Sequence, residues 1–318
     1  RLTTDCFEYC SRAMPLWNPI SISGYHIREA GATAVQELAF TFANARTYVR
    51  AAIDRGLPVD SFAPRLSFFW NAHSHLFEEA AKFRAARRLW ARLLRERTGC
   101  REPECLRMRF HAQTAGSTLT AAQPELNVAR TTLQALAAVL GGTQSLHTNA
   151  WDEALGLPTT AAATLALRTQ QVLAHESGVA DAVDPLAGSY YVERLTDRIE
   201  QGARALIAEV EAAGGAVAAA ESGFVRRAVE EAAYRHALRV ESGEAVVVGV
   251  NRFVEARPGT PVPGRGPDPA VEREQVAHLA AVRRQRDASG VAAALDEVRR
   301  VAGGPGNLLP PMDRALRA

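Results

Sequence analysis

A repeated alternation of short apolar runs and long helical segments constrains the fold more than any other feature of this sequence. Four runs rich in apolar or β-branched residues are expected to form strands: Ile20–Ser23, Leu66–Phe69, Leu106–Phe110 and Gln144–Leu146. A segment with helical periodicity follows each run: Thr33–Asp54, His75–Arg97, Asn127–Leu140 and Thr160–His175. Because a helical crossover brings the chain back in the same direction, such units build a parallel sheet. The sequence therefore predicts an α/β fold.

Four strand-and-helix units are half of the number that closes an eight-stranded barrel. The pattern predicts the C-terminal half of a (β/α)8 TIM barrel, and since the chain opens at Arg1 without a methionine, we expect the first half upstream. An open doubly wound sheet is the alternative. Polar residues beyond each run favour the barrel, because the strands of a barrel share one C-terminal mouth. These residues are Gly24-Tyr25-His26, Ser67 with Asn71, His111-Ala112-Gln113 and His147-Thr148-Asn149.

Beyond the barrel half the alternation stops. Long alanine- and glutamate-rich helices are expected at Val192–Gly214 and Ser222–Ser242, and Ala245–Val250 is compatible with one more strand. A Pro/Gly-rich stretch after them indicates a linker. Four segments are thus predicted: a barrel half (1–180), a helical extension packed on it (181–257), a linker (258–269) and a C-terminal helical segment (270–318).

Composition excludes several classes of function. The net charge is +2 and the arginines are interleaved among glutamates, so the sequence shows no basic patch of the kind that binds nucleic acid. The one lysine, Lys82, makes Schiff-base chemistry an unfavourable interpretation. No run approaches the roughly 20 apolar residues of a membrane span and no signal segment opens the chain, so a cytoplasmic protein without a membrane partner is expected. Two cysteine pairs lack zinc-ribbon spacing and are interpreted as reduced thiols: Cys6, Cys10, Cys100 and Cys105.

Several long motifs follow one another along the chain. They are ISISGYHIREAGA (Ile20–Ala32), FAPRLSFFW (Phe62–Trp70), AARRLWA (Ala85–Ala91), HAQTAGSTLT (His111–Thr120), GGTQSLHTNAWDEALGLPT (Gly141–Thr159), DPLAGSYYVE (Asp184–Glu193) and VVVGVNRF (Val246–Phe253). With these motifs the chain resembles the adenosylcobalamin-dependent acyl-CoA mutase family, which includes methylmalonyl-CoA and isobutyryl-CoA mutases. The resemblance implies that adenosylcobalamin supplies a radical for the rearrangement of a short branched acyl-CoA, while the protein positions and shields the reactants.

Tyr25 and His26 place a phenol beside an imidazole at the end of the first predicted strand. Such a pair can hydrogen-bond a carbonyl oxygen. The alternative is that His26 is a buried structural histidine whose hydrogen bonds are made within the protein. The resemblance implies that His26 binds the thioester carbonyl and that Tyr25 borders the radicals. It also implies that Glu29 contacts the edge of the corrin ring.

Arg65 and Ser67 share a face of the second predicted strand by its two-residue period, and an arginine with a hydroxyl can hold phosphate or an amide. A surface ion pair is the alternative for Arg65. The resemblance implies that Arg65, Leu66 and Ser67 contact the coenzyme A tail.

His111 and Gln113 alternate on the third predicted strand and are expected to point into the barrel. Polar groups satisfied by backbone are the alternative. Asn149 and Glu153 are four residues apart, so they are expected on one face of a helical turn, where an amide and a carboxylate suit ribose hydroxyls. The resemblance implies that His111 and Gln113 line the substrate cavity and that Asn149 and Glu153 hold the adenosyl ribose.

Two histidines and two glutamates near the second helix have the composition of a metal cluster: His73, His75, Glu78 and Glu79. Because a third ligand has no convincing spacing, we interpret them as a solvated helix start and expect no metal site.

The chain departs from the family at Leu16, Ser117 and Glu125, and Ser117 leans toward the isobutyryl and hydroxyisobutyryl branch. The Asp-x-His-x-x-Gly motif of the family's cobalamin-binding domain is absent. We therefore expect that domain to be a small subunit or a removed segment, within a homodimer or heterotetramer. The departures keep open a non-catalytic, truncated barrel that serves assembly. A coenzyme A-dependent barrel enzyme without cobalamin is a third class.

Overall fold

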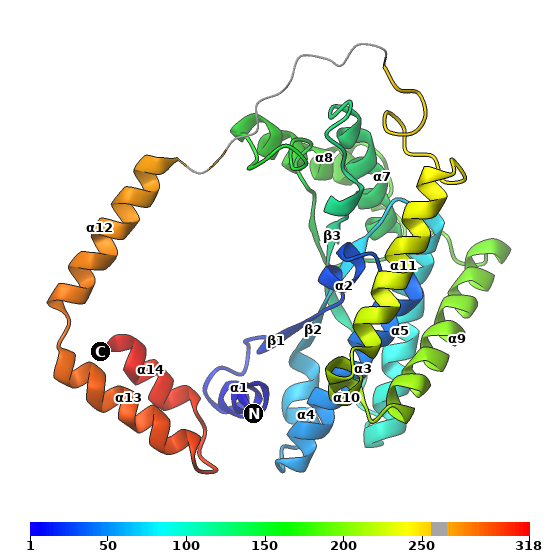
Figure 1. The fold of residues 1–318 in the computed structure, drawn as a ribbon. Helices are drawn as coiled ribbons and strands as arrows, with labels where there is room; N and C mark the ends of the chain where they lie inside the picture. Colours follow the sequence, from blue (N-terminus) through cyan, green and yellow to red (C-terminus); the bar gives the residue numbers. More distant parts are fainter. Residues whose placement is uncertain (256–265, 267) are drawn as a thin grey trace.

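The computed structural model describes residues 1–255, 266 and 268–318. Its centre is a four-stranded sheet in the order β1 (Ile20–Ser23), β2 (Leu66–Ala72), β3 (Arg109–Thr114) and β4 (Ser145–His147). All three neighbouring pairs are parallel, so the predicted parallel α/β architecture is confirmed. Figure 1 labels β1, β2 and β3, which lie together at the centre of the molecule.

Helices connect the strands as the periodicity predicts. The main connecting helices are α3 (Ala34–Asp54), α5 (Leu76–Thr98), α7 (Leu126–Leu140) and α8 (Thr160–His175). Short helical turns fill the remaining connections: α2 (Tyr25–Glu29), α4 (Val59–Phe62), η1 (Ala63–Arg65), α6 (Pro103–Leu106) and η2 (Gly116–Thr118). Helix α1 (Leu2–Ala13) precedes β1. The start of α3 is fixed by a capping box, in which Thr33 and Gln36 exchange side-chain to backbone hydrogen bonds.

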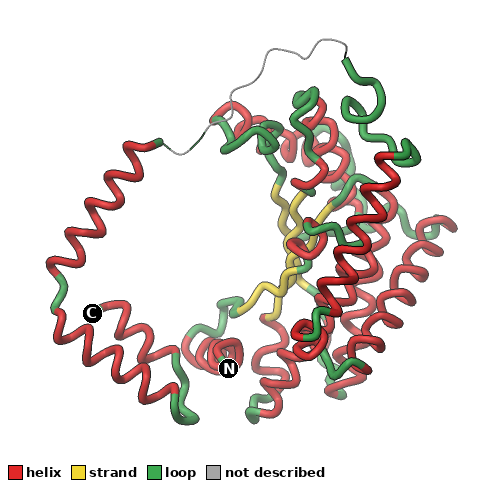
Figure 2. The backbone as a smooth tube through the Cα atoms, viewed as in Figure 1, coloured by secondary structure: helices red, strands yellow, loops and turns green. Residues whose placement is uncertain are grey.

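One face of the sheet is buried against helices. Phe68 and Trp70 on β2 pack against Phe42 of α3 and Trp90 of α5, with ring centroids 4.9 to 6.0 Å apart. Each of these rings is at most 2% exposed. Burying a large apolar side chain contributes roughly 1.5–3 kcal/mol, so this aromatic cluster fixes both helices on the sheet. Figure 2 shows α3 and α5 on the same side of the strands.

The opposite face of the sheet carries polar and aromatic residues, which stay partly accessible except for the fully buried Asn71. The register aligns Ser23, Phe69, His111 and Ser145 in one row across the four strands. A second row lies nearer the carboxyl ends of the strands and contains Asn71, Gln113 and His147. Because side chains alternate along a strand, both rows face away from the aromatic cluster.

The strands extend further than the apolar runs suggest. Strand β2 continues to Ala72 and β3 to Thr114, so Asn71, His111 and Gln113 lie within strands rather than after them. The prediction that Ser67 follows a strand is therefore wrong, since it is the second residue of β2. Arg65 is in the turn η1 before β2, so it does not share a strand face with Ser67.

The helical extension consists of α9 (Tyr190–Ala212), α10 (Ala216–Glu221) and α11 (Phe224–Glu241). Helix α9 packs on α3 and α5 (Figure 1). Arg84 of α5 donates to Asp184 and Glu193, which fastens the start of this extension. The possible strand at 245–250 is not formed, because this segment makes only an isolated bridge between Val248 and Arg252.

The C-terminal segment forms three helices, α12 (Pro269–Gln285), α13 (Ala288–Ala302) and α14 (Leu309–Arg317). It returns to the start of the chain, where Arg1 donates to the carbonyl oxygens of Val301 and Gly306. Most of the predicted linker, 258–269, lies outside the described residues. Within the described ranges, no helix combines the length and the apolarity that a bilayer crossing requires.

Candidate functional site

The predicted site residues meet where β3 ends. Gln113 donates through Nε2 to Oδ1 of Asn149 at 2.9 Å, and Asn149 Nδ2 donates to the carbonyl of Thr114 at 3.0 Å. The hydroxyl of Tyr25 also reaches that carbonyl, at 3.4 Å. Three segments far apart in the sequence therefore share one backbone group at the carboxyl end of the sheet.

Tyr25 is held between this carbonyl and the polar face of the sheet. Its ring is 8% exposed and stacks on Phe69, with centroids 4.7 Å apart and planes 4° from parallel. Burial, together with the nearby carboxylate of Glu29, raises the pKa of Tyr25 to about 12. The phenol therefore stays neutral at physiological pH and can donate a hydrogen bond.

His26 is the next residue, and its side chain is exposed. Its Nδ1 lies 3.0 Å from the hydroxyl of Ser23, and its ring meets that of Phe69 edge-on at 6.0 Å. Within the described part of the chain, Nε2 makes no hydrogen bond. The imidazole thus has one nitrogen anchored to β1 and the other available to a ligand.

Glu29 connects two segments around the site through hydrogen bonds to its carboxylate. Its carboxylate accepts from Asn71 Nδ2 at 2.6 Å, from the backbone N–H of Ser117 at 2.8 Å and from the Ser117 hydroxyl at 3.2 Å. The departure at Ser117 therefore adds a hydrogen bond to Glu29. Three charge-assisted bonds fix this carboxylate at the rim.

Glu153 faces Glu29 across Gly116. A Cβ added at Gly116 would come within 2.6 Å of the Glu153 carboxylate, 3.2 Å of Glu29 and 3.2 Å of Asn149, so a larger residue there would displace the Glu153 side chain. Partial desolvation of its carboxyl group and the charge of Glu29 raise the pKa of Glu153, although the residue as a whole is exposed. Asn149 and Glu153 lie in a loop and turn rather than in a helix, so the expected helical face is wrong.

Asn127 connects the loops that carry these residues. Its amide nitrogen donates to the carbonyls of Thr120 and Trp151, both at 2.9 Å, and its oxygen accepts from the Thr120 N–H at 3.1 Å. Asn127 is buried. In the sequence it lies two residues after Glu125, where the chain departs from the family, and that position did not indicate this role. It ties the Gly116 loop to the turn of Glu153.

A buried ion network lies directly behind the site. The ammonium of Lys82 contacts Glu37 at 2.7 Å, Glu79 at 2.5 Å and the carbonyl of Asn71 at 2.6 Å, and all three charged side chains are fully buried. Arg28 adds a contact to Glu79 at 3.3 Å. The interpretation of Glu79 as part of a solvated helix start is therefore wrong.

The network orders two segments of the site. Glu37 accepts from the backbone N–H of Asn71 at 2.8 Å, while the side chain of Asn71 holds Glu29. Arg28 belongs to α2, the short helix that also carries Tyr25, His26 and Glu29. The feature of the sequence that hints at this network is a single lysine among many arginines. That feature does not indicate which residues the lysine contacts.

The predicted coenzyme A residues lie toward the other end of the sheet. The hydroxyl of Ser67 donates to the carbonyl of Ile20 at 2.8 Å, Leu66 is buried in the core, and Arg65 is partly exposed. His111 is intermediate along β3, where its Nδ1 lies 2.7 Å from the Ser145 hydroxyl. Burial and the proximity of His147 lower the pKa of His111, so its imidazole is neutral at pH 7.

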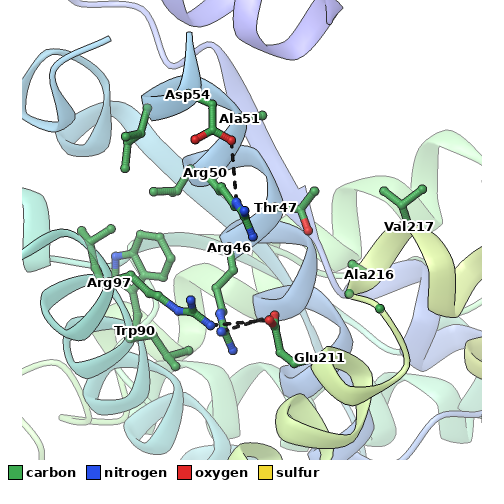
Figure 3. Close-up of a pocket in the computed structure, with 16 residues that line it drawn as sticks. Arg46, Thr47, Arg50, Ala51, Asp54, Trp90, Arg97, Glu211, Ala216 and Val217 are labelled. Atoms are coloured by element: carbon green, nitrogen blue, oxygen red, sulfur yellow. Dashed lines mark hydrogen bonds and ion pairs between the residues drawn. The ribbon is translucent and has the colours of Figure 1, made fainter. Parts of the chain in front are cut away.

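A cavity of about 660 Å³ lies elsewhere. It is lined by the last turns of α3 and α5 and by the chain around 211–217; Figure 3 shows Arg46 and Arg97 converging on Glu211. Helices run antiparallel to the strands that they connect, so these helix ends mark the amino ends of the strands. The cavity thus lies at the opposite end of the sheet from Tyr25 and Asn149.

Comparisons with known proteins identify the family of the chain. A sequence profile described as methylmalonyl-CoA mutase matches residues 1–318. The chain belongs to the methylmalonyl-CoA mutase family. It is 48% identical over 312 residues to the 2-hydroxyisobutanoyl-CoA mutase large subunit of Aquincola tertiaricarbonis, which covers 98% of this chain and 56% of that protein.

Two further relatives are named methylmalonyl-CoA mutase. The protein of Rhizobium meliloti (strain 1021) is 49% identical over 323 residues, covering 100% of this chain and 45% of the relative. That of Escherichia coli (strain K12) is 46% identical over 317 residues, covering 100% and 44%. The chain thus spans about half the length of these mutase-family relatives, and its identity to the two kinds of mutase is nearly equal.

Proposed function

We propose that this chain forms part of an adenosylcobalamin-dependent acyl-CoA mutase and supplies one wall of its reaction chamber. The observation that carries the proposal is the meeting of Tyr25, Glu29, Gln113, Asn149 and Glu153 around the end of β3. Membership of the mutase family supports it. The substrate is a short branched acyl-CoA of the methylmalonyl, isobutyryl, ethylmalonyl or hydroxyisobutyryl type.

The sheet is proposed to be half of a (β/α)8 barrel. Among the described residues, the long helices α3 and α5 cover one face, and the other face presents rows of mostly polar side chains that an open sheet would leave to solvent. Such rows are typical of the inside of a barrel, where side chains from neighbouring strands form layers. The carboxyl end, with the loops of Tyr25 and Asn149, would be the mouth.

The proposed substrate lies along this inner face. Ser67 and Asn71 are four residues apart on β2, which is about 13 Å at about 3.3 Å per residue. A ligand that contacts Ser67 near one end and His26 near the other must therefore be long and narrow. The pantetheine arm of coenzyme A has that shape, so Arg65, Leu66 and Ser67 are proposed to hold the tail while the thioester reaches His26.

The residues at the rim fit the adenosyl group of the cofactor. The carboxylate of Glu153 accepts no hydrogen bond within the described ranges, and the buried Oδ1 of Asn71 has no partner there. Ribose hydroxyls are donors that match such acceptors. We propose that Glu153 and Asn149 hold this ribose and that Glu29 lies against the corrin edge; when bound, the cofactor supplies the radical that removes a hydrogen from the substrate.

His26 is proposed to stabilise the substrate carbonyl. If the Ser23 hydroxyl donates to Nδ1, then Nε2 carries the proton and donates it to the thioester oxygen. A fixed donor lowers the energy of charge that develops on that oxygen. The neutral phenol of Tyr25 and the ring of Phe69 shield the same region from water.

The proposed partners are the acyl-CoA substrate and a cobalamin-binding subunit or domain. One relative is named a large subunit, which supports an enzyme of several chains. A homodimer or a heterotetramer is proposed for the whole enzyme.

The test is isomerisation by the enzyme that contains this chain. The enzyme, loaded with adenosylcobalamin, is incubated in turn with the four acyl-CoA types named above, and the products are separated by chromatography. Conversion of one of them to its carbon-skeleton isomer is expected. If the loaded enzyme converts none of the four, the proposal is wrong and an assembly role for the barrel is favoured.

A further inference from the structure

Two cysteines and an aspartate meet at the amino end of the sheet, away from Tyr25 and Asn149. The thiols of Cys100 and Cys105 lie 3.4 and 3.3 Å from Oδ1 of Asp60. One ligand atom from each of the three residues lies within 4.8 Å of the others, and no other such group of His, Cys, Asp and Glu occurs among the described residues. The spacing of the two cysteines did not indicate this cluster, because its third member, Asp60, comes 40 residues before Cys100.

The cluster joins three segments that lead into the sheet. Asp60 is on α4, which continues through η1 into β2. Cys100 follows the left-handed residue Gly99 that ends α5, and its N–H donates to the Thr98 hydroxyl at 3.1 Å. Cys105 is on α6, directly before β3, and is 1% exposed. Local backbone structure thus fixes the position of both thiols.

We propose that Cys100, Cys105 and Asp60 form a binding site for a thiophilic divalent cation, with Zn²⁺ as the expected occupant. In a tetrahedral zinc site, bonds of about 2.3 Å to sulfur and about 2.1 Å to oxygen place sulfur and oxygen about 3.5 Å apart. The distances from the two sulfur atoms to Oδ1 of Asp60 are close to this sulfur–oxygen distance. Two thiolates select soft or borderline ions over Mg²⁺ and Ca²⁺.

The exposure of the three side chains suits an ion that binds from the solvent side. Cys105 is buried, Cys100 is half-buried and Asp60 is exposed. Binding converts both thiols to thiolates and releases their two protons, which leaves a Cys₂Asp complex with one net negative charge. Asp60 is exposed, so water can complete the coordination. The bound ion would then hold together the segments that lead into β2 and β3.

The test is metal titration of the reduced, chelator-treated enzyme that contains this chain, because the chain alone is expected to be poorly soluble. We expect one Zn²⁺ per chain with micromolar or tighter affinity, release of about two protons per ion, and a higher thermal unfolding midpoint. Co²⁺ should give a thiolate-to-cobalt charge-transfer absorption in the near ultraviolet. Asp60→Asn should weaken Zn²⁺ binding by at least about 10- to 100-fold, because loss of a carboxylate that only supports a ligand already costs that much at other sites.

The other two cysteines provide a matched control. Cys6 and Cys10 are four residues apart on α1, and a chain with Cys6→Ser and Cys10→Ser should bind Zn²⁺ as the original does. The chain with Cys100→Ser and Cys105→Ser should not bind it. Binding that survives the second pair of changes, or binding no tighter than millimolar in the original chain, overturns the proposal.

A measurement on the unchanged chain guards against variants that do not fold. Cys100 and Cys6 are both half-buried, so their alkylation can be compared by mass spectrometry of peptides. Zn²⁺ should slow alkylation of Cys100 at least tenfold and leave Cys6 unaffected. Equal rates with and without Zn²⁺, or a Cys100–Cys105 disulfide in a chain that binds no metal after reduction, also contradict the site.

Discussion

His26 combines an exposed position with an anchored ring, which suits a group that must meet a substrate in one orientation. In the complete enzyme, His26→Ala should lower turnover by about 100- to 10,000-fold, the usual range for one positioned acid or donor. His75→Ala is the matched control, since this exposed histidine lies at the N-cap of α5 and should change turnover little. Turnover of the His26 variant within threefold of the original would contradict the role.

Ser23 is expected to act through His26 as a positioning residue. Loss of one neutral hydrogen bond costs about 1 kcal/mol, so Ser23→Ala should reduce kcat by about fivefold while KM changes little. Ser21 shares the strand face of Ser23 without contacting His26, so Ser21→Ala is the control. Equal effects of the two variants would assign Ser23 a structural role only.

At the scale of elements, the ion network of Lys82 holds β2, α3 and α5 behind the site. Removing one partner of a buried ion pair leaves the others uncompensated and costs about 3–5 kcal/mol, so Lys82→Met should lower the free energy of unfolding by that amount. Arg95→Met, on the exposed side of the same helix, should change it by less than about 0.5 kcal/mol. Urea unfolding measures both, and similar values for the two variants would show that the network adds no stability.

Glu79 predicts how stability depends on pH. Burial alone would raise the pKa of Glu79, but Lys82 and Arg28 outweigh it and hold this pKa at about 2. The unfolded value is about 4.3, so this carboxylate contributes up to about 3 kcal/mol above that pH and loses it as the pH falls toward 2. Glu37 acts in the opposite sense, because burial raises its pKa. Glu79→Gln should therefore flatten the acid loss of stability, whereas an unchanged slope would contradict the assignment.

The elements were predictable from the sequence to the extent that local pattern determines them. Thr160–His175 matches its helix to the residue, and the other connecting helices begin or end within one residue of the periodic segments. Strand ends were predicted less well. Asn71 and Thr114 are polar but buried, so β2 and β3 continue past the apolar runs that indicated them. Side-chain partners such as Asp60 and Cys105 depend on tertiary contact and leave no local pattern.

At the scale of the whole molecule, the site is one-sided. Strands β1 and β4 each have a single partner within the described residues, and the polar face between them carries the residues proposed to meet substrate. Radical chemistry requires a chamber closed to water and oxidants. A chamber of this kind needs a second wall and a cobalamin-binding part, and the rows on β2, β3 and β4 are the surface that such a wall would cover.

The last prediction is that this chain alone neither binds cobalamin tightly nor catalyses isomerisation. None of its histidines belongs to an Asp-x-His-x-x-Gly motif, so no lower-ligand group of that type is present, and unpaired strand edges should also make the isolated chain poorly soluble. Adding the other barrel half and a cobalamin domain should restore binding and turnover. The purified chain is mixed with adenosylcobalamin, and its visible spectrum and equilibrium binding are measured. Micromolar or tighter binding with displacement of the cofactor's own lower ligand would falsify this division of function and would indicate a ligand among His73, His75 and His147.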